Sequence, residues 1–217
     1  MTRRQWLAAM AAGVETVWAG GAPPVLPVHQ VLDRKAGHER PHERAYWGRI
    51  WPQAAGDLAH CGVRMVMTYS EGEVERPPSR TPVIHGLARG RLNLVVTDRI
   101  PVEWDGGRGL AGVTTLYRGF HLCMVSVARA HAHWIPFVAV NTCTHEMLHA
   151  LLLDIFENRP PGFWGQAREL RVDAVATRLW LLKDGSAVRG PAREYVKRLR
   201  EGSSQGSRAA EGPTVPA

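Results

Sequence analysis

Between residues 137 and 156 the apolar residues recur at helical spacing, and two histidines four residues apart lie within this stretch. On a helix, the side chains of His145 and His149 lie one turn apart on the same face. Glu146 directly follows the first histidine. An apolar stripe already supplies a packing face, formed by Val140, Met147, Leu148, Leu151, Leu152 and Ile155. We therefore predict a helix over residues 137–156 whose histidines lie next to this packing face.

Two imidazoles in this arrangement can point at one metal ion, with zinc–nitrogen distances of about 2.0–2.1 Å. Glu146 would lie beside the ion without binding it, where a general base for an attacking water belongs. The simpler alternative is a core helix with two incidental histidines, which would need other polar partners if buried. The spacing predicts metal ligands at His145 and His149 and a catalytic base at Glu146.

A second helical stretch, residues 166–183, follows a break at Pro160-Pro161-Gly162. Glu169 and Asp173 lie four residues apart on a stripe that also holds Val172, Ala176 and Trp180. Carboxylates on such a face are costly unless a cation or a hydrogen bond compensates. We predict that Glu169 is the third metal ligand and that Asp173 accepts a hydrogen bond from a ligand histidine. The alternative is a surface salt bridge between Glu169 and Arg168, Arg171 or Arg178.

Together, His145-Glu146-Met147-Leu148-His149 and Glu169-Leu170-Arg171-Val172-Asp173 resemble the zincin metallopeptidases, and within them the gluzincins. The resemblance implies a zinc ion, hydrolysis of peptide bonds, and a peptide or protein substrate that lies along an edge strand. Gly112–Tyr117 would be that strand. The glycine and third histidine of the metzincins are absent, since Leu152 and Ile155 stand in their region.

The chain is short after the second helix, where larger gluzincins have a subdomain whose Tyr or His holds the oxyanion. Tyr195 is the candidate for this role, with His131 and His133 as weaker ones. A structural or solvent-facing role is the alternative for each of the three.

Strand-like stretches precede both helices. Strands are expected at residues 63–69, 92–97, 112–117 and 120–127, a helix at 46–61, a long loop at 70–91 and a short helix at 191–199. The order predicts an α+β fold. The resemblance adds that this fold is zincin-like, with a small mixed sheet, a backing helix, an active-site helix and a downstream glutamate-bearing helix.

One main domain is expected over residues 46–200, preceded by a linker at 23–45 and followed by a disordered tail at 201–217. Residues 1–22 contain Thr2-Arg3-Arg4-Gln5-Trp6-Leu7, which resembles the twin-arginine export signature. The alternative is an amphipathic N-terminal helix. The first interpretation implies export to the periplasm or beyond, and the second leaves the chain in the cytoplasm.

Hydrophobic residues make up 45% of the 217 positions, enough for a packed core. The formal net charge is +7, but the arginines are scattered, so we expect no nucleic-acid partner. No apolar run approaches the ~20 residues of a membrane span. Three cysteines are too few for a disulfide framework, and buried free thiols are the simplest interpretation.

The sequence thus predicts a zinc-dependent hydrolase, a metallopeptidase by its resemblance. Two alternatives stay open. The chain could be a catalytically inactive binding protein with a zincin fold, or a zinc amidohydrolase that acts on a non-peptide substrate.

Overall fold

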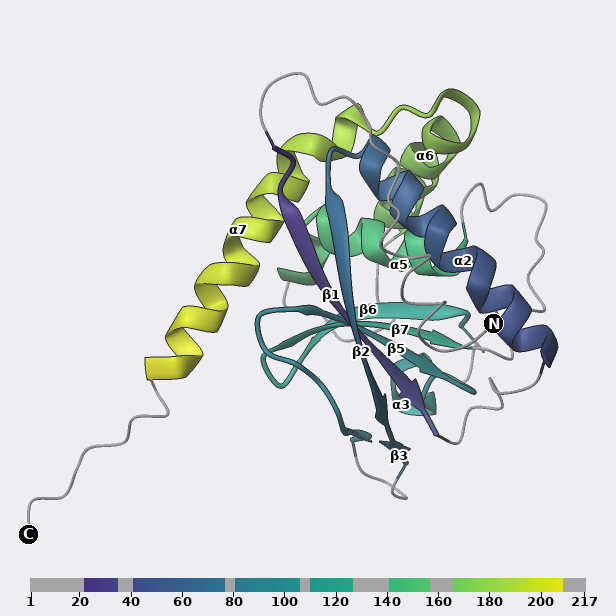
Figure 1. Cartoon of the computed structure of the whole chain (residues 1–217), viewed down its shortest axis with the longest axis vertical. Helices are drawn as coiled ribbons and strands as arrows, with labels where there is room; N and C mark the ends of the chain where they lie inside the picture. Colours follow the sequence, from purple (N-terminus) through teal and green to yellow (C-terminus); the bar gives the residue numbers. More distant parts are fainter. Residues whose placement is uncertain are drawn as a thin grey trace, which may run out of the picture.

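The computed structural model describes residues 22–34, 41–76, 81–105, 110–126, 141–156 and 166–208. The N-terminal segment 1–21, the candidates His131 and His133, and the tail from residue 209 lie outside the described residues. Within them the chain has a mixed α/β fold with one mostly parallel five-stranded sheet and four long helices (Figure 1).

The sheet contains β1 (Val25–Asp33), β2 (Arg64–Gly72), β5 (Leu92–Thr97), β6 (Gly112–Tyr117) and β7 (Phe120–Ser126), in the spatial order β2-β1-β5-β7-β6. The helices are α2 (Pro41–His60), the short α3 (Val102–Asp105), α5 (Thr142–Leu151), α6 (Gln166–Leu182) and α7 (Ser186–Arg208). A 3-10 turn, η1 (Asp154–Phe156), follows α5, and β3 (Val74–Glu75) pairs with β4 (Val83–Ile84) in a hairpin. The strands predicted at 92–97 and 112–117 are confirmed at both ends.

One edge of the sheet is formed by β6, the strand that runs antiparallel to its neighbour β7. The two strands join through Arg118 and Gly119, which both have positive φ, 48° and 79°. Positive φ at both central residues is the geometry of a tight hairpin turn whose twist matches that of the strands. The sequence prediction that Gly112–Tyr117 is an edge strand is confirmed.

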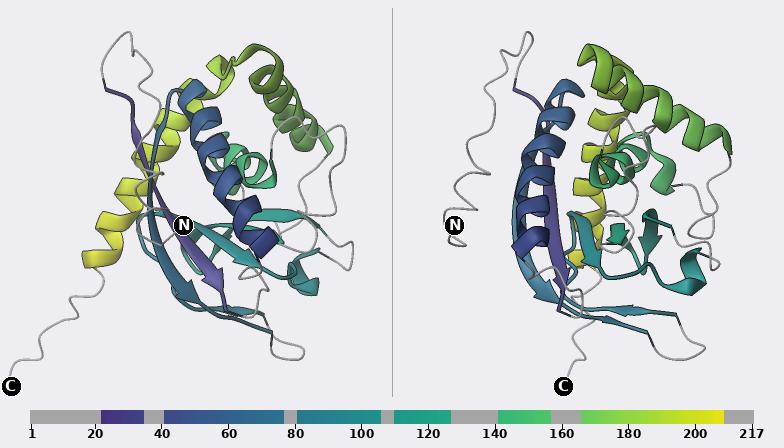
Figure 2. Two further views of the ribbon diagram at one scale, coloured as in Figure 1. Left: turned by 45° about the vertical axis from the view of Figure 1, so that its right-hand side comes forward. Right: turned by 90° about the vertical axis from the view of Figure 1, so that its right-hand side faces the viewer.

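The two faces of the sheet pack against different elements (Figure 2). All four long helices contribute to the core on one face, where they meet strand residues Leu26, Val28, Leu92, Leu94, Val96, Cys123 and Val125. The opposite face packs against the β3–β4 hairpin and α3, through strand residues Val31, Val95, Val113, Tyr117, Leu122 and Met124. Because α5 contacts β6, β7 and the other three long helices, it is the centre of the helical layer.

The linker prediction for residues 23–45 is wrong over Val25–Asp33, which forms the inner strand β1. Proline is normally disfavoured within a sheet, because it donates no hydrogen bond to the neighbouring strand. Pro27 is accommodated because it pairs with Val66 of β2, whereas pairing of β1 with β5 begins only at Val28.

Both terminal helices are longer than predicted. α2 begins at Pro41, not at Tyr46, and proline suits a first helical position because its ring presets φ and its missing N–H has no partner there. α7 begins at Ser186, whose N–H is accepted by Asp184 at 2.9 Å, and continues to Arg208. The prediction of disorder from residue 201 is therefore wrong over residues 201–208.

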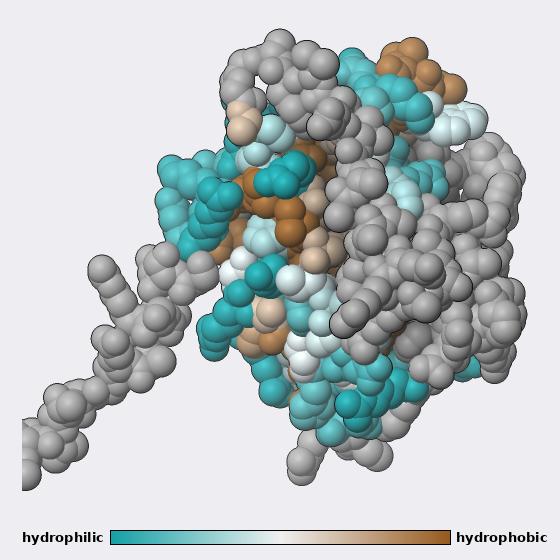
Figure 3. Space-filling model, viewed as in Figure 1, coloured by the Kyte–Doolittle hydropathy of each residue, from teal (hydrophilic) through white to brown (hydrophobic). Residues whose placement is uncertain are grey.

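Within the described residues, no helix combines the length and apolar character that crossing a bilayer requires. The three cysteines Cys61, Cys123 and Cys143 are free and buried, as predicted. The end of α6 exposes Trp180, Leu181 and Leu182, and a hydrophobic patch lies over this helix at the top of Figure 3.

Candidate metal centre

The histidine helix α5 begins at Thr142 and is capped by Asn141, whose side chain accepts the N–H of Thr144 at 2.9 Å. Asparagine is among the preferred N-cap residues because it satisfies one of the N–H groups that a helix start leaves unpaired. The helix lies between the sheet and its helical neighbours, so even Glu146 and His149 are buried, at 6% and 1% exposure. Buried groups of this kind need specific polar partners.

Three donor groups converge at the junction of α5 and α6. His145 Nε2 lies 3.2 Å from His149 Nε2 and 3.3 Å from Glu169 Oε2. His149 Nε2 lies 3.5 Å from Glu169 Oε1. One ligand atom from each of His145, His149 and Glu169 falls within 4.8 Å of the others, which makes this cluster a group that could hold a metal ion.

The donor spacing fits a tetrahedral ion. Two atoms each about 2.05 Å from such an ion are about 3.3 Å apart, which is close to the separations of His145 Nε2 from His149 Nε2 and from Glu169 Oε2. The 3.5 Å separation from His149 Nε2 is to the other carboxylate oxygen, Oε1. Imidazole nitrogens and a carboxylate oxygen are also a chemically suitable donor set for a divalent transition metal. The three residues that the sequence predicted as ligands are thus brought together by the fold.

The carboxylates of Asp154 and Glu169 favour a positive charge on or beside His149. Burial would lower the pKa of His149, but the carboxylates of Asp154 and Glu169 raise it to about 9. Burial would raise the pKa of Glu169, but hydrogen bonds from His145 and His149 hold it at about 2. Without a metal ion, a proton on His149 balances the Glu169 carboxylate. A bound cation would take the place of that proton.

The orientation of His149 is set by Asp154 of η1. His149 Nδ1 lies 2.9 Å from Asp154 Oδ2, and both side chains are buried. Because a carboxylate only accepts, Nδ1 carries a hydrogen and donates it, so Nε2 is the ring atom that faces His145 and Glu169, and its lone pair would become available to a metal ion once the second proton has left. Arg171 of α6 forms an ion pair with the other oxygen of Asp154.

Glu146 lies against the edge strand. Its Oε2 accepts a hydrogen bond from Thr114 Oγ1 at 2.7 Å, and the same hydroxyl lies 2.8 Å from its backbone carbonyl. The space beside its carboxyl group exists because residue 112 is a glycine. Burial raises the pKa of Glu146, while the charges of His145 and His149 act in the opposite direction. The carboxyl group is therefore close enough for its pKa to respond to the charges of His145 and His149.

Asp173 does not make the predicted hydrogen bond. Its Oδ1 lies 3.9 Å from His145 Nδ1, an ion-pair distance that is too long for a hydrogen bond, and its side chain is 59% exposed. The residue lies next to a ligand histidine, but the close carboxylate–imidazole bond of this site is made by Asp154.

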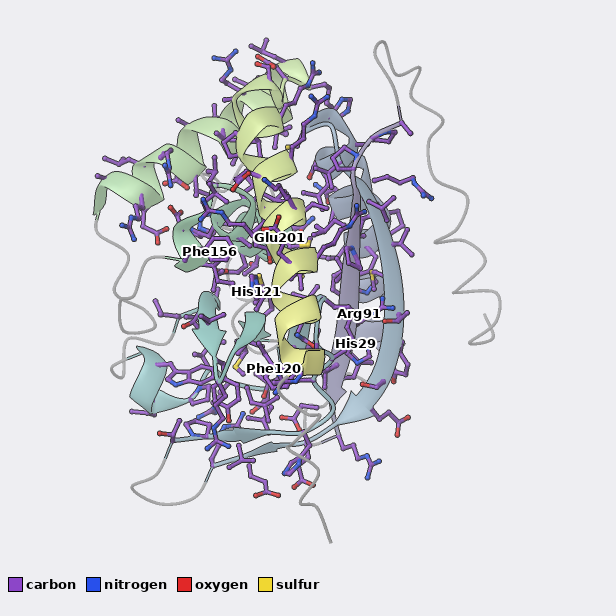
Figure 4. All side chains as sticks on the ribbon, turned by 90° about the vertical axis from the view of Figure 1, so that its left-hand side faces the viewer. His29, Arg91, Phe120, His121, Phe156 and Glu201 are labelled. Atoms are coloured by element: carbon purple, nitrogen blue, oxygen red, sulfur yellow. The ribbon has the colours of Figure 1, made fainter. Side chains whose placement is uncertain are left out.

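The prediction for Tyr195 as an oxyanion donor is contradicted by its position. The side chain is fully buried, and its hydroxyl lies 3.0 Å from His121 Nδ1. His121 and Phe156 lie beside α7 (Figure 4), and their rings pack on that of Tyr195. A hydroxyl enclosed in this aromatic cluster has no access to a substrate.

Sequence reasoning missed Asp154, Gly112 and Thr114. Asp154 is the one charged residue in the run Leu151-Leu152-Leu153-Asp154-Ile155-Phe156, and that isolation was a usable signal. In the predicted helix, which continued to Phe156, Asp154 would lie on a different face from His149. In the structure α5 ends at Leu151, and Leu153 turns the chain with φ of 70°. Gly112 and Thr114 carried no comparable signal, because their role depends on contacts across the fold.

The chain matches no protein-family model, and comparison with curated proteins and with solved structures finds no significant similarity.

Proposed function

We propose that this chain is a zinc-dependent metallopeptidase, with His145, His149 and Glu169 as ligands and Glu146 as general base. The observation that carries the proposal is the convergence of one ligand atom from each of these three residues within 4.8 Å, with the buried Glu146 carboxyl within range of their charges. A purely structural zinc site is closed by four protein ligands and needs no base. Three ligands plus a neighbouring carboxylate are the composition of a catalytic site.

His145, His149 and Glu169 would hold the ion as three protein ligands, one fewer than the four that close a structural zinc site. A zinc ion bound here would supply Lewis-acid chemistry, lowering the pKa of water towards about 7 and polarising a carbonyl group. The residues of this chain do the rest. Asp154 holds the tautomer of His149, and Glu169 adds the negative charge that binds the cation.

Glu146 acts as the proton carrier. Its carboxylate takes a proton from the attacking water and delivers it to the nitrogen of the leaving amine. Burial raises its pKa towards the pH at which such exchange is efficient, and the Thr114 hydroxyl holds one oxygen in place. Acid–base help of this kind contributes about 10²–10⁴-fold to a rate.

The edge strand β6 supports a peptide substrate over a non-peptide amide. An edge strand has backbone N–H and C=O groups without a partner on its outer side, and an extended peptide can pair with them. The first residue of β6, Gly112, is the residue against which the Glu146 carboxyl packs. A peptide aligned on β6 would therefore run past the general base.

The arrangement of the helices supports the finer proposal that the fold is zincin-like. α2 packs on the sheet and against α5, as a backing helix would. α5 lies over β6 and β7, and α6 brings Glu169 to the two histidines. This order of parts is what the resemblance to gluzincins implies.

The test combines metal analysis with digestion of a proteome-derived peptide library. We expect the parent protein to contain about one zinc per chain and to cleave peptides. Glu146→Gln should keep the zinc and lose at least 10²-fold in rate, whereas Glu169→Ala should lose the zinc. Glu71→Gln makes the same chemical change at an exposed glutamate, paired with Arg34, and should leave both properties unchanged.

The rival functions give different results. Zinc without cleavage of any library peptide would indicate a binding protein. Zinc with hydrolysis of small amides but not of peptides would indicate an amidohydrolase. Cleavage by Glu146→Gln at the parental rate would refute the assignment of the base.

A further inference from the structure

Asp154 is fully buried and lies between the histidine helix and the glutamate helix. One carboxylate oxygen accepts the His149 Nδ1 hydrogen at 2.9 Å. The other faces Arg171, with which it forms an ion pair, and lies 4.0 Å from Arg168 Nε. A buried carboxylate is tolerated where such partners compensate for its lost hydration. One oxygen of Asp154 therefore contacts α5 through His149, and the other contacts α6 through Arg171.

The chain adopts a costly conformation to bring Asp154 there. α5 ends at Leu151, and Leu153 has a φ of 70°, in the left-handed region that non-glycine residues seldom adopt. Such a conformation is unfavourable for a leucine and persists where surrounding contacts determine it. The following turn η1 places Asp154 directly against the ring of His149. Strain of this type is concentrated at functional sites.

Helix α6 reaches the site in two ways. Glu169 extends to the Nε2 atoms of both histidines, and Arg171 extends to Asp154. Arg171 also lies 3.5 Å from the carbonyl oxygen of Leu152 at the end of α5. The two α6 residues are two positions apart in the sequence, one contacting the histidines of α5 and the other the turn after it.

We propose that Asp154 positions His149 for metal binding and that Arg171 positions Asp154, so that metal affinity depends on the chain Arg171–Asp154–His149 as well as on the three ligands. This inference rests on the proposed metal site. It assigns the positioning of His149 to a residue outside the Glu169–Asp173 pattern. It also gives Arg171 a role in metal binding, although its side chain is 47% exposed.

The test measures zinc dissociation constants by competition with a chromogenic chelator. Asp154→Asn should bind zinc about 10–100-fold more weakly than the parent, the range known for partners that orient a ligand histidine. Arg171→Ala should weaken binding about three- to tenfold, since it removes one charged hydrogen bond that acts through Asp154. Asp173→Asn, a matched change at the exposed carboxylate near His145, should stay within about twofold.

A double variant tests whether the two residues act in series. If Arg171 works through Asp154, the Asp154→Asn/Arg171→Ala protein should bind zinc as Asp154→Asn alone does. If the loss of zinc affinity in the double variant equals the product of the two single losses, Arg171 acts independently of Asp154, and the proposed action in series is wrong. Arg171→Lys, which keeps the charge but not the forked donors, should recover part of the affinity lost in Arg171→Ala.

A spectroscopic readout separates positioning from general stability. With saturating cobalt(II) in place of zinc, Asp154→Asn should shift the visible absorption bands, because the basicity of a ligand imidazole has changed, whereas Asp173→Asn should not. Unchanged bands and affinities within twofold of the parent in both Asp154→Asn and Arg171→Ala would overturn the inference while leaving the proposed metal site intact. Failure of the parent to bind zinc would overturn the proposed function itself.

Discussion

Gly112 and Glu146 are packed so closely that a methyl group on the first would overlap the carboxyl group of the second. A Cβ built on Gly112 would lie 2.6 Å from Cγ and 2.7 Å from Cδ of Glu146. Separations under 3 Å require one side to move. The glycine is thus a condition for the observed position of the proposed base.

Gly112→Ala should therefore displace the Glu146 carboxyl group while leaving the metal ligands in place. We expect peptide cleavage to fall by about 10²-fold or more, with zinc content unchanged, as measured by steady-state kinetics and elemental analysis. Gly56→Ala is the matched control, because a Cβ at this α2 position meets nothing within 4 Å. It should stabilise the protein by up to ~1 kcal/mol and keep full activity. Equal activity of the two variants would contradict the role of Gly112.

Thr114→Val removes the hydroxyl that donates to Glu146 at almost constant volume. Burial already raises the pKa of Glu146, and the Thr114 hydrogen bond lowers it. Loss of that bond should raise the pKa further and shift the acid limb of the kcat/KM profile to higher pH. The buried acceptor left unpaired should also cost about 1–3 kcal/mol in the free energy of unfolding. Thr114→Ser keeps the hydroxyl and should restore the parental profile.

The zinc-free protein should be most stable in mildly acidic solution. The pKa of His149 is raised from 6.5 to about 9, so its contribution is complete below pH 6.5 and is lost as the pH rises through 9. The pKa of Glu169 is lowered from 4.5 to about 2, so its contribution is present above pH 4.5 and is lost as the pH falls through 2. The midpoint temperature of thermal unfolding, measured on chelator-treated protein, should be highest between about pH 4.5 and pH 6.5.

Zinc affinity should change in the opposite direction over the same alkaline range. The proton on His149 competes with the cation, so affinity should rise by about tenfold per pH unit between pH 6.5 and 8.5. Chelator competition at several pH values measures this slope. In His149→Gln the alkaline loss of zinc-free stability should largely disappear. A pH-independent affinity in the parent would indicate that His149 is not a ligand.

Tyr195→Phe should have little effect on catalysis. The lost hydroxyl contacts His121 inside the core, so we expect a destabilisation of about 0.5–1.5 kcal/mol and an unchanged kcat. Chemical denaturation and steady-state kinetics measure the two quantities. A kcat reduced by 10²-fold would restore the sequence-based assignment of Tyr195 to the oxyanion.

Local patterns were sufficient to predict the parts of the site that lie on single helices. His145 and His149 share a face because of helical geometry alone, and Glu169 follows from a carboxylate on a partly apolar stripe. Likewise, the strands at 92–97 and 112–117 are continuous β-rich runs bounded by turn residues. These features depend on neighbours within a few residues.

The missed features depend on contacts between distant segments. Proline is disfavoured in most positions of a sheet, yet the sheet tolerates Pro27 where β1 has only one neighbour. Asp154 was assigned to a continuing helix, because nothing local indicated that a leucine would adopt a positive φ. Tyr195 was chosen for its chemistry alone, and its burial against His121 arises from the packing of α7 on β7.

Because the turn after α5 brings Asp154 back to His149, part of the site can be described by a short sequence motif. Residues 145–154 read His-Glu-Met-Leu-His-Ala-Leu-Leu-Leu-Asp, so the proposed base, two proposed metal donors and the carboxylate of Asp154 fall within ten consecutive positions. A pattern of His-Glu-x-x-His, three leucines at the seventh to ninth positions and aspartate at the tenth can be searched for directly in other chains. An arginine two residues after a downstream glutamate, as Arg171 follows Glu169 here, would be the second part of the motif.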